Sequence, residues 1–280
     1  MGRSSIFYLS SILLFLGACE QRDWYNKELS ADVMKQYSPQ LRAGRGFYYQ
    51  GSVPEQFQNK EAMLLDSTDA DLWREFGTAR VKRGILDEMD YYYGKAVDLK
   101  PEGWAGFRGY LYLYFYRDFQ RAIDGFNLGD EVVGEVDYSQ GQNHEYMRGI
   151  CYYGLGDYDQ AISSFSSYIS STTASDGAEW VDVYAHLYNG LAYIQKGEFE
   201  QALLEFDKAE KIYPKLSDLF YHRARIALNQ GRIADAERLL QTAREYFQEG
   251  YYHQRPYVEV LEQIYIQDID KLEKEIADLS

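Results

Sequence analysis

Residues 189–214 read NGLAYIQKGEFEQALLEFDKAEKIYP, and this stretch decides the fold. Small residues at Gly190 and Ala202 allow two antiparallel helices to approach each other closely. Gly197 lies between the two helices, where the residue that follows a helix often adopts a positive φ. Pro214 ends the second helix, because proline has no backbone N–H and cannot continue the hydrogen-bond ladder. The stretch therefore predicts a pair of helices joined by a short turn.

The same spacing recurs along the chain, and the residue near the start of each second helix measures the period. These positions are Met89, Ala122, Ala161, Ala202 and Ala236. Their separations are 33, 39, 41 and 34 residues, and the excess over 34 falls in two polar stretches, 128–143 and 170–182. Insertions that leave the register of a repeat intact belong in loops. The sequence therefore predicts a repeat architecture rather than a single globular core.

This spacing resembles that of the tetratricopeptide repeat family, whose signature runs W-x2-L-G-x2-Y, then A-x3-F, then P. The unit around residue 190 matches the signature at Gly190, Tyr193, Ala202, Phe206 and Pro214. It departs from the signature at the Trp and Leu positions, which are His186 and Asn189 here.

Four further units keep parts of the signature. The matching residues are Trp73, Phe76, Gly77, Tyr93, Ala96 and Pro101 in the first unit, Ala122 and Phe126 in the second, Gly149, Tyr152, Ala161 and Phe165 in the third, and the small residues Ala224, Ala227, Ala236 and Ala243 in the fifth. The first helix of the second unit lacks glycine at the expected place. The resemblance implies an all-α fold, an α-solenoid of about five to six stacked antiparallel helix pairs, with the repeat domain at residues 70–250.

The segments on either side of the repeats complete the predicted architecture. Residues 44–69 predict a degenerate N-terminal repeat, because they show the spacing of a helix pair only in part. In residues 251–280, apolar side chains recur at helical spacing from Val258 to Leu279, which predicts a long amphipathic C-terminal helix. One hypothesis is that this helix caps the solenoid with a polar outer face, and the other is that it forms a homodimer.

The N-terminal residues 1–18 have the features of a secretory signal peptide. An apolar run from Ile6 to Leu16 follows a basic residue and precedes small residues, and it is too short to span a membrane. The sequence Leu16-Gly17-Ala18-Cys19 resembles the bacterial lipobox. That resemblance implies that Cys19 is acylated and becomes the first residue of the mature lipoprotein.

Residues 19–43 are polar and predict an acylated tether between the lipid and the repeats. Several acyl chains give lasting membrane attachment without a spanning helix, since each buried CH2 contributes about 0.8 kcal/mol. The resemblance implies a place in the bacterial cell envelope. Glu20, which follows the cysteine in place of the aspartate of a retention signal, favours the outer membrane.

The chain is strongly acidic, with 44 acidic and 29 basic side chains and a formal net charge of −15. This excess repels nucleic acids and anionic lipid surfaces, so no nucleic-acid partner is expected. The expected partner is a protein or peptide with a basic segment. Contact with the membrane is expected through the N-terminal lipid.

The sequence contains no spacing that is typical of a catalytic or metal site. The four histidines, at 144, 186, 222 and 253, are far apart and form no His-Glu-x-x-His pattern. With Cys19 acylated, Cys151 has no disulfide partner, and we interpret it as a buried structural residue. We therefore expect neither an enzyme nor a cofactor.

Tyrosine is the unusual residue, with 28 copies. The densest run, residues 110–116, alternates tyrosine as a strand would, but the repeat register places it in a helix. In the tetratricopeptide family the first helix of each pair lines the concave surface. The residues that we expect to face it and to bind a partner are Tyr146, Tyr153, Tyr184, Tyr221, Arg225 and Asn229. Tyrosine and arginine are favoured anchors at interfaces, because they bury a large area at low entropic cost.

Two functions fit these features. The first is a membrane-anchored scaffold or adaptor that binds proteins in the cell envelope. The alternative is a glycan-binding envelope lipoprotein whose exposed tyrosines stack on sugar rings. Binding that weakens strongly with salt would favour the protein partner over the sugar.

Overall fold

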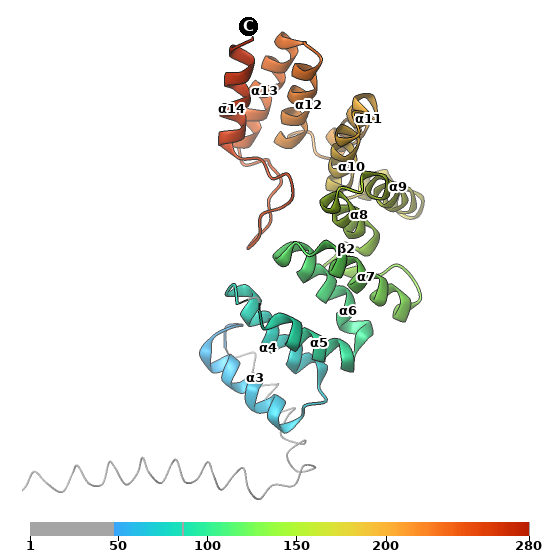
Figure 1. The fold of residues 1–280 in the computed structure, drawn as a ribbon, viewed down its shortest axis with the longest axis vertical. Coiled ribbons are helices and arrows are strands. Elements are labelled where there is room, and N and C mark those ends of the chain that lie inside the picture. Colours follow the sequence, from blue (N-terminus) through green and yellow to red (C-terminus); the bar gives the residue numbers. More distant parts are fainter. Residues whose placement is uncertain (1–47, 86, 280) are drawn as a thin grey trace, which may run out of the picture. The chain divides into compact units, whose positions relative to one another are not determined.

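The computed structural model describes residues 48–85 and 87–279 of the chain, which divides into two compact units, 1–99 and 100–280. The described part of the first unit contains α3 (Val53–Leu65), α4 (Ala70–Lys82) and α5 (Met89–Leu99). Helices α4 and α5 form the first predicted pair (Figure 1). The signal peptide, Cys19, the tether and the first residues of the expected degenerate repeat lie outside the described residues.

The second unit continues the helix pairs (Figure 1). The pairs are α6 (Pro101–Leu111) with α7 (Phe119–Val133), α8 (His144–Leu155) with α9 (Tyr158–Ser175), α10 (Val183–Gln195) with α11 (Phe199–Ile212), and α12 (Ser217–Asn229) with α13 (Ile233–Gln248). Two short strands, β1 (Tyr138–Ser139) and β2 (Gln142–Asn143), and a 3-10 helix, η3 (Ala178–Trp180), lie in the two predicted insertions. The final helix is α14 (Ile266–Ala277). The predicted all-α solenoid fold is confirmed.

A close contact between a glycine and an aromatic ring fixes the pairs α8–α9 and α10–α11. A Cβ atom added at Gly190 would lie 2.4 Å from the ring of Phe206, and one added at Gly149 would lie 2.6 Å from Phe165. The rings of Phe165 and Phe206 are fully buried, so they have little room to move away from a larger residue. The turn glycine Gly197 has a φ of 75°, as predicted for the residue that follows a helix.

The second pair makes the same contact, one residue out of register. Gly109 packs against the ring of Phe126, whereas the expected place of the glycine, one residue later, is held by Tyr110. The separation is 17 residues, whereas Gly149–Phe165 and Gly190–Phe206 are 16 residues apart. A π-helix, η2 (Tyr112–Tyr116), follows α6 directly. Because a π-turn holds one more residue than an α-turn, it absorbs the extra residue and keeps the pair packed.

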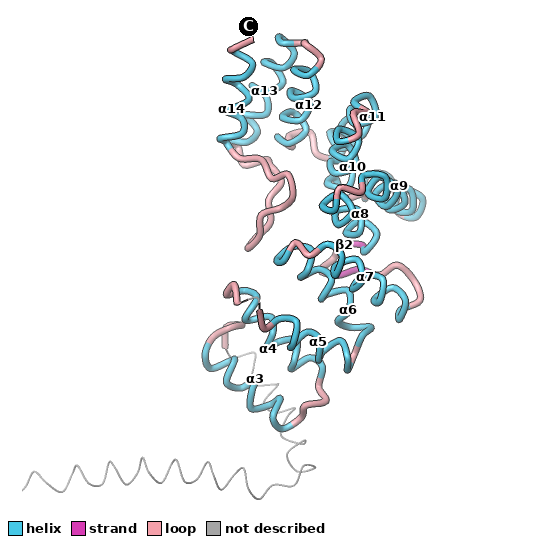
Figure 2. The backbone as a smooth tube through the Cα atoms, viewed as in Figure 1, coloured by secondary structure: helices cyan, strands magenta, loops and turns pink. Residues whose placement is uncertain are grey.

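The C-terminal region differs from the long helix that the sequence predicts. Only α14 is helical, and residues 251–265 form an irregular segment between α13 and α14 (Figure 2). Pro256 lies in this segment, and Tyr257 and Glu262 have positive φ values of 71° and 54°, which an α-helix does not allow. The apolar residues that suggested a continuous helix are divided between this segment and α14.

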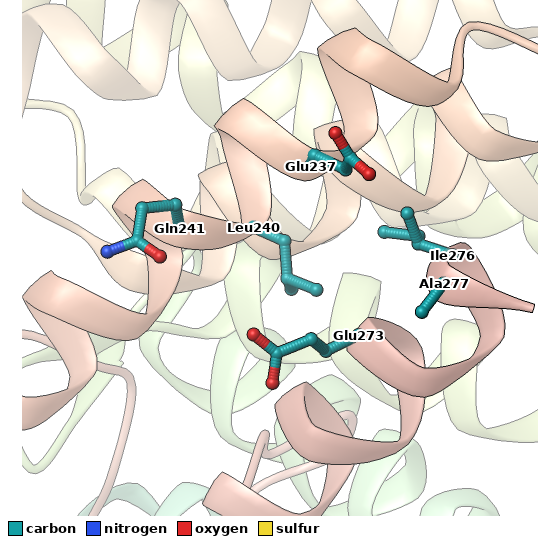
Figure 3. Close-up of a pocket in the computed structure, with 6 residues that line it drawn as sticks. All are labelled: Glu237, Leu240, Gln241, Glu273, Ile276 and Ala277. Atoms are coloured by element: carbon teal, nitrogen blue, oxygen red, sulfur yellow. The ribbon is translucent and has the colours of Figure 1, made fainter. Parts of the chain in front are cut away.

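Helix α14 covers the end of the repeats in the way that was expected of a capping helix. Its apolar residues Ile269, Leu272 and Ile276 are buried in a cluster with residues of α12 and α13. A hollow of about 230 Å³ remains between α13 and α14, with Leu240 and Ile276 in its lining and Glu237 and Glu273 beside them (Figure 3). The dimer hypothesis requires that the apolar face of α14 is exposed, but α12 and α13 of the same chain cover this face. In residues 48–85 and 87–279, no helix is long and apolar enough to cross a membrane.

Candidate functional site

The segment 251–265, which we call the strap, lies on the first helices of the pairs in the second unit (Figure 1). It descends from α13, turns at Pro256 and Tyr257, and returns to α14. Arg255 and Val258 face each other in an antiparallel bridge across this turn. Proline at the second position and a positive φ at the third form the pattern of a type II turn. The strap is therefore a narrow hairpin laid along the repeats.

The surface under the strap, which we call the inner face, is built by α6 with η2, α8, α10 and α12. At the tip of the strap, the guanidinium of Arg255 lies over the ring of Tyr114, with its carbon 4.1 Å from the ring centroid. Arg255 also donates a hydrogen bond from Nη2 to the hydroxyl of Tyr110, at 3.1 Å. Tyr110 and Tyr114 are four residues apart, so both rings reach the same side of the α6–η2 helix.

The descending limb of the strap is held by α10 and α12. The ring of His253 stacks on that of Tyr184, with centroids 3.7 Å apart and planes at 19°. The backbone N–H of His253 donates to Oδ2 of Asp218 at 2.9 Å. His253 and Asp218 are 4% and 1% exposed, so this hydrogen bond forms away from solvent. In such surroundings an unpaired N–H would be costly, and the carboxylate satisfies it.

The returning limb is held by hydroxyl groups of the inner face. Tyr188 donates from its hydroxyl to the carbonyl oxygen of Leu261 at 2.9 Å. Tyr153 donates to the carboxylate of Glu262 at 3.0 Å. Arg117, just after η2, forms an ion pair with Glu259 at 2.9 Å. Both main-chain and side-chain groups of the strap are therefore recognised.

The structure places the six predicted partner-binding residues in three different settings. Tyr146 and Tyr153, expected on an open surface, are buried instead, at 2% and 6% exposure. Tyr146 lies beside Phe165 and Tyr168, in the packing between α8 and α9. Tyr184 is half-buried because His253 stacks on it. The sequence predicts that the rings of these three tyrosines contact a partner, but residues of the repeat core and of the strap cover them instead.

The other three predicted residues lie on α12. Tyr221 is half-buried against the cluster that α14 completes. Arg225 and Asn229 are exposed, and the Arg225 guanidinium lies 5.9 Å from the Tyr221 ring. Arg225 is seven residues, or two helical turns, after Asp218. Both residues therefore lie on the same side of α12, the side on which the strap is bound.

Sequence reasoning missed five residues that hold the strap. They are Tyr110, Tyr114, Arg117, Tyr188 and Asp218. The spacing of four between Tyr110 and Tyr114, and again between Tyr184 and Tyr188, is a signal that each pair shares a helix face. The signal was not decisive, because most aromatic side chains of such repeats pack in the core.

His144 and His186 each contact a carboxylate within the fold, and Cys151 lies in the core. His144 contacts Asp130 at 2.6 Å and His186 contacts Glu205 at 2.7 Å. Cys151 is fully buried, and desolvation raises the pKa of its thiol. Within the described residues, no group of three His, Cys, Asp or Glu side chains is placed to hold a metal ion.

Burial displaces the pKa of three groups on or beside the inner face. Desolvation lowers the pKa of His222 and of His253 to about 3, and it raises that of Asp218 to about 6. Both ring nitrogens of His222 are buried without a hydrogen-bond partner in the described part of the chain. His222 and His253 are therefore neutral in the folded protein at any pH well above 3.

Comparison with known families identifies the repeats. Residues 146–217 and 193–254 each match a family model described as tetratricopeptide repeat. These residues are tetratricopeptide repeats. No curated protein matches the chain. Proteins built from tetratricopeptide repeats are generally binding scaffolds rather than enzymes.

Solved structures share the fold of these tetratricopeptide repeats at low sequence identity. PilW, described as a type IV pilus biogenesis factor, is 14% identical over 86% of this chain and 97% of its own, with a TM-score of 0.57. MamA from Desulfovibrio magneticus RS-1 is 18% identical over 64% and 96%, with a TM-score of 0.53. A tetratricopeptide repeat protein from Parabacteroides merdae is 16% identical over 93% and 89%, with a TM-score of 0.51. At these identities the likeness shows the fold alone.

We predict that His222→Phe weakens the acid sensitivity of the tetratricopeptide repeats. As pH falls from 6.5 towards 3, the unfolded chain binds a proton at His222 and the folded chain does not, so stability is lost at up to about 1.4 kcal/mol per pH unit. His253 acts with the same sign, and Asp218 with the opposite sign between about 6 and 3.8. Phenylalanine removes the contribution of His222 and its unpaired nitrogens.

The measurement is the urea midpoint of both proteins between pH 8 and pH 4.5. At pH 8 the histidine is neutral in both states, so the difference there reports packing alone. We expect the variant to lose less stability than the wild type over this range. Equal losses would show that His222 is protonated in the folded protein.

Proposed function

We propose that this chain is a protein-interaction scaffold of the bacterial cell envelope, whose inner face binds extended segments of polypeptide. One observation carries the proposal: the inner face holds an extended segment of this chain. It does so through the hydroxyl of Tyr188 on a main-chain carbonyl, the carboxylate of Asp218 on a main-chain N–H, and the stacked ring of Tyr184. Groups placed in this way fit polypeptide in general, because every peptide carries a carbonyl and an N–H.

The same geometry favours a protein partner over a glycan. Stacking on a sugar needs an exposed aromatic ring, but Tyr146 and Tyr153 are buried and Tyr184 is covered by His253. Carboxylates beneath the strap, Asp182 and Asp218, and the net charge of −15 support a partner segment with basic residues. One structure with the same fold, YrrB, is described as having an unusual peptide-binding site; it is 18% identical over 67% of this chain and 91% of its own, with a TM-score of 0.50.

The membrane attachment is proposed from the sequence. Cys19 closes a lipobox-like tetrapeptide, and the polar residues 19–43 give a tether of enough length to hold the repeats away from the lipid. We propose that the acylated Cys19 fixes the scaffold to a membrane of the envelope, with the outer membrane favoured.

We predict that an alkyne-tagged fatty acid labels the chain in growing bacterial cells through Cys19. The Cys19→Ala variant should lose the label and leave the membrane fraction. Cys151→Ala is the matched control, because Cys151 is the second of the two cysteines and is buried, and this variant should keep the label. Label that persists in Cys19→Ala would contradict the anchoring.

We predict that the exposed end of the inner face contacts a partner in cells. A photo-crosslinking amino acid at Asn229, on first helix α12, should give a discrete protein adduct. The same amino acid at Gln201, exposed on second helix α11, is the control and should not give that adduct. Adducts from Gln201 alone, or none from either position, would contradict binding at the inner face.

A further inference from the structure

Tyr110 and Tyr114 form an aromatic pair that holds a guanidinium group. Their ring centroids are 4.9 Å apart, and the carbon of the Arg255 guanidinium is 4.1 Å from the centroid of Tyr114 and 5.5 Å from that of Tyr110. The hydrogen bond from Arg255 Nη2 to the Tyr110 hydroxyl orients the group. A planar cation over aromatic faces with one directed hydrogen bond is the arrangement that suits arginine and not lysine.

The aromatic pair is held by residues outside the strap. Tyr110 stacks on Phe107, with centroids 5.8 Å apart. Tyr114 donates from its hydroxyl to Oε1 of Gln142 in β2 at 2.9 Å, and it is 8% exposed. The π-helix η2 supplies Tyr114, and such turns are frequent at functional sites. The receptor for the guanidinium is therefore built by residues of α6, η2 and β2, all outside the strap.

The tip of the strap is held less firmly than its base. At the base, His253, Val260 and Ile264 are at most 4% exposed. At the tip, Tyr257 is 76% exposed and keeps a positive φ, which is an unfavourable conformation for a bulky residue. Within the described residues, Arg255 makes no ion pair with a carboxylate. Arg255, through the two tyrosines, and Glu259, through its ion pair with Arg117, connect this end of the strap to the repeats.

We propose that the Tyr110–Tyr114 pair is an arginine-recognition site. Arg255 fills this site in the free chain, and an arginine side chain of a partner segment replaces Arg255 when the tip of the strap lifts. The inference rests on the proposed function and adds the chemistry of the ligand. The occupant is an extended segment that carries arginine. The contacts of Arg255 show that a guanidinium group fits against the two tyrosine rings. The acidic residues around the site, which include Asp182, favour a positively charged side chain.

The test measures binding of a labelled peptide, HQRPYV, which copies residues 253–258, to the full-length protein by fluorescence anisotropy. In Arg255→Ala the site is empty, and we expect the peptide to bind at least ten-fold more tightly than to the wild type. Arg238→Ala is the matched control: it removes an exposed arginine from α13, a second helix, and leaves the site filled, so it should bind like the wild type. Arg255→Gln serves as a second variant if alanine unfolds the strap.

Two further measurements separate specific recognition from attraction to an acidic protein. Replacing the arginine of the peptide by lysine, or adding Tyr110→Leu to Arg255→Ala, should abolish the gain. Equal binding of the lysine peptide, no effect of Tyr110→Leu, or no gain in Arg255→Ala and Arg255→Gln would overturn the proposal. A crosslink from Asn229 that persists in that case would leave the scaffold function standing and reject the arginine site alone.

Discussion

The close approach of two helices at a glycine is the constraint on which the rest of this structure depends. At Gly149 and Gly190 a single Cβ atom would collide with a buried ring on the partner helix. The contact fixes the rotation of each first helix about its axis, and rotation decides which side chains reach the inner face. Tyr184 and Tyr188 reach the strap from α10 because Gly190 holds that helix in place.

The inner face is consequently a row of aromatic and acidic side chains, and its tyrosine rings need to be shielded from water. The strap covers the inner face, where the stacked ring of His253 and the carbonyl of Leu261 contact α10 and the guanidinium of Arg255 contacts α6 and η2. Covering the face from within keeps its tyrosines out of water. A partner that binds this face, as we propose, would therefore compete with the chain's own segment instead of entering an empty groove.

The helix pairs were predictable because their signal is local. A small residue and an aromatic residue sixteen positions later recur with a period close to 34, and the signal survives insertions and even the extra residue of η2. The strap was not predictable in this way. Val258, Leu261 and Ile264 have helical spacing, but the conformation of the strap is decided by contacts with distant residues, such as that of Arg255 with Tyr110, 145 positions away. The prediction that Tyr146 is exposed was wrong for a different reason, because its ring packs within its own helix pair, against Phe165 and Tyr168 of α9.

The most direct test of this account is amide hydrogen exchange of the strap, followed residue by residue by NMR. The account predicts that the N–H of His253, which donates to Asp218 in a buried position, exchanges far more slowly than in an unstructured peptide, and that Asp218→Ala accelerates it. Exchange of His253 at the rate of an unstructured chain, while α13 and α14 remain protected, would contradict the docking of the strap on the inner face.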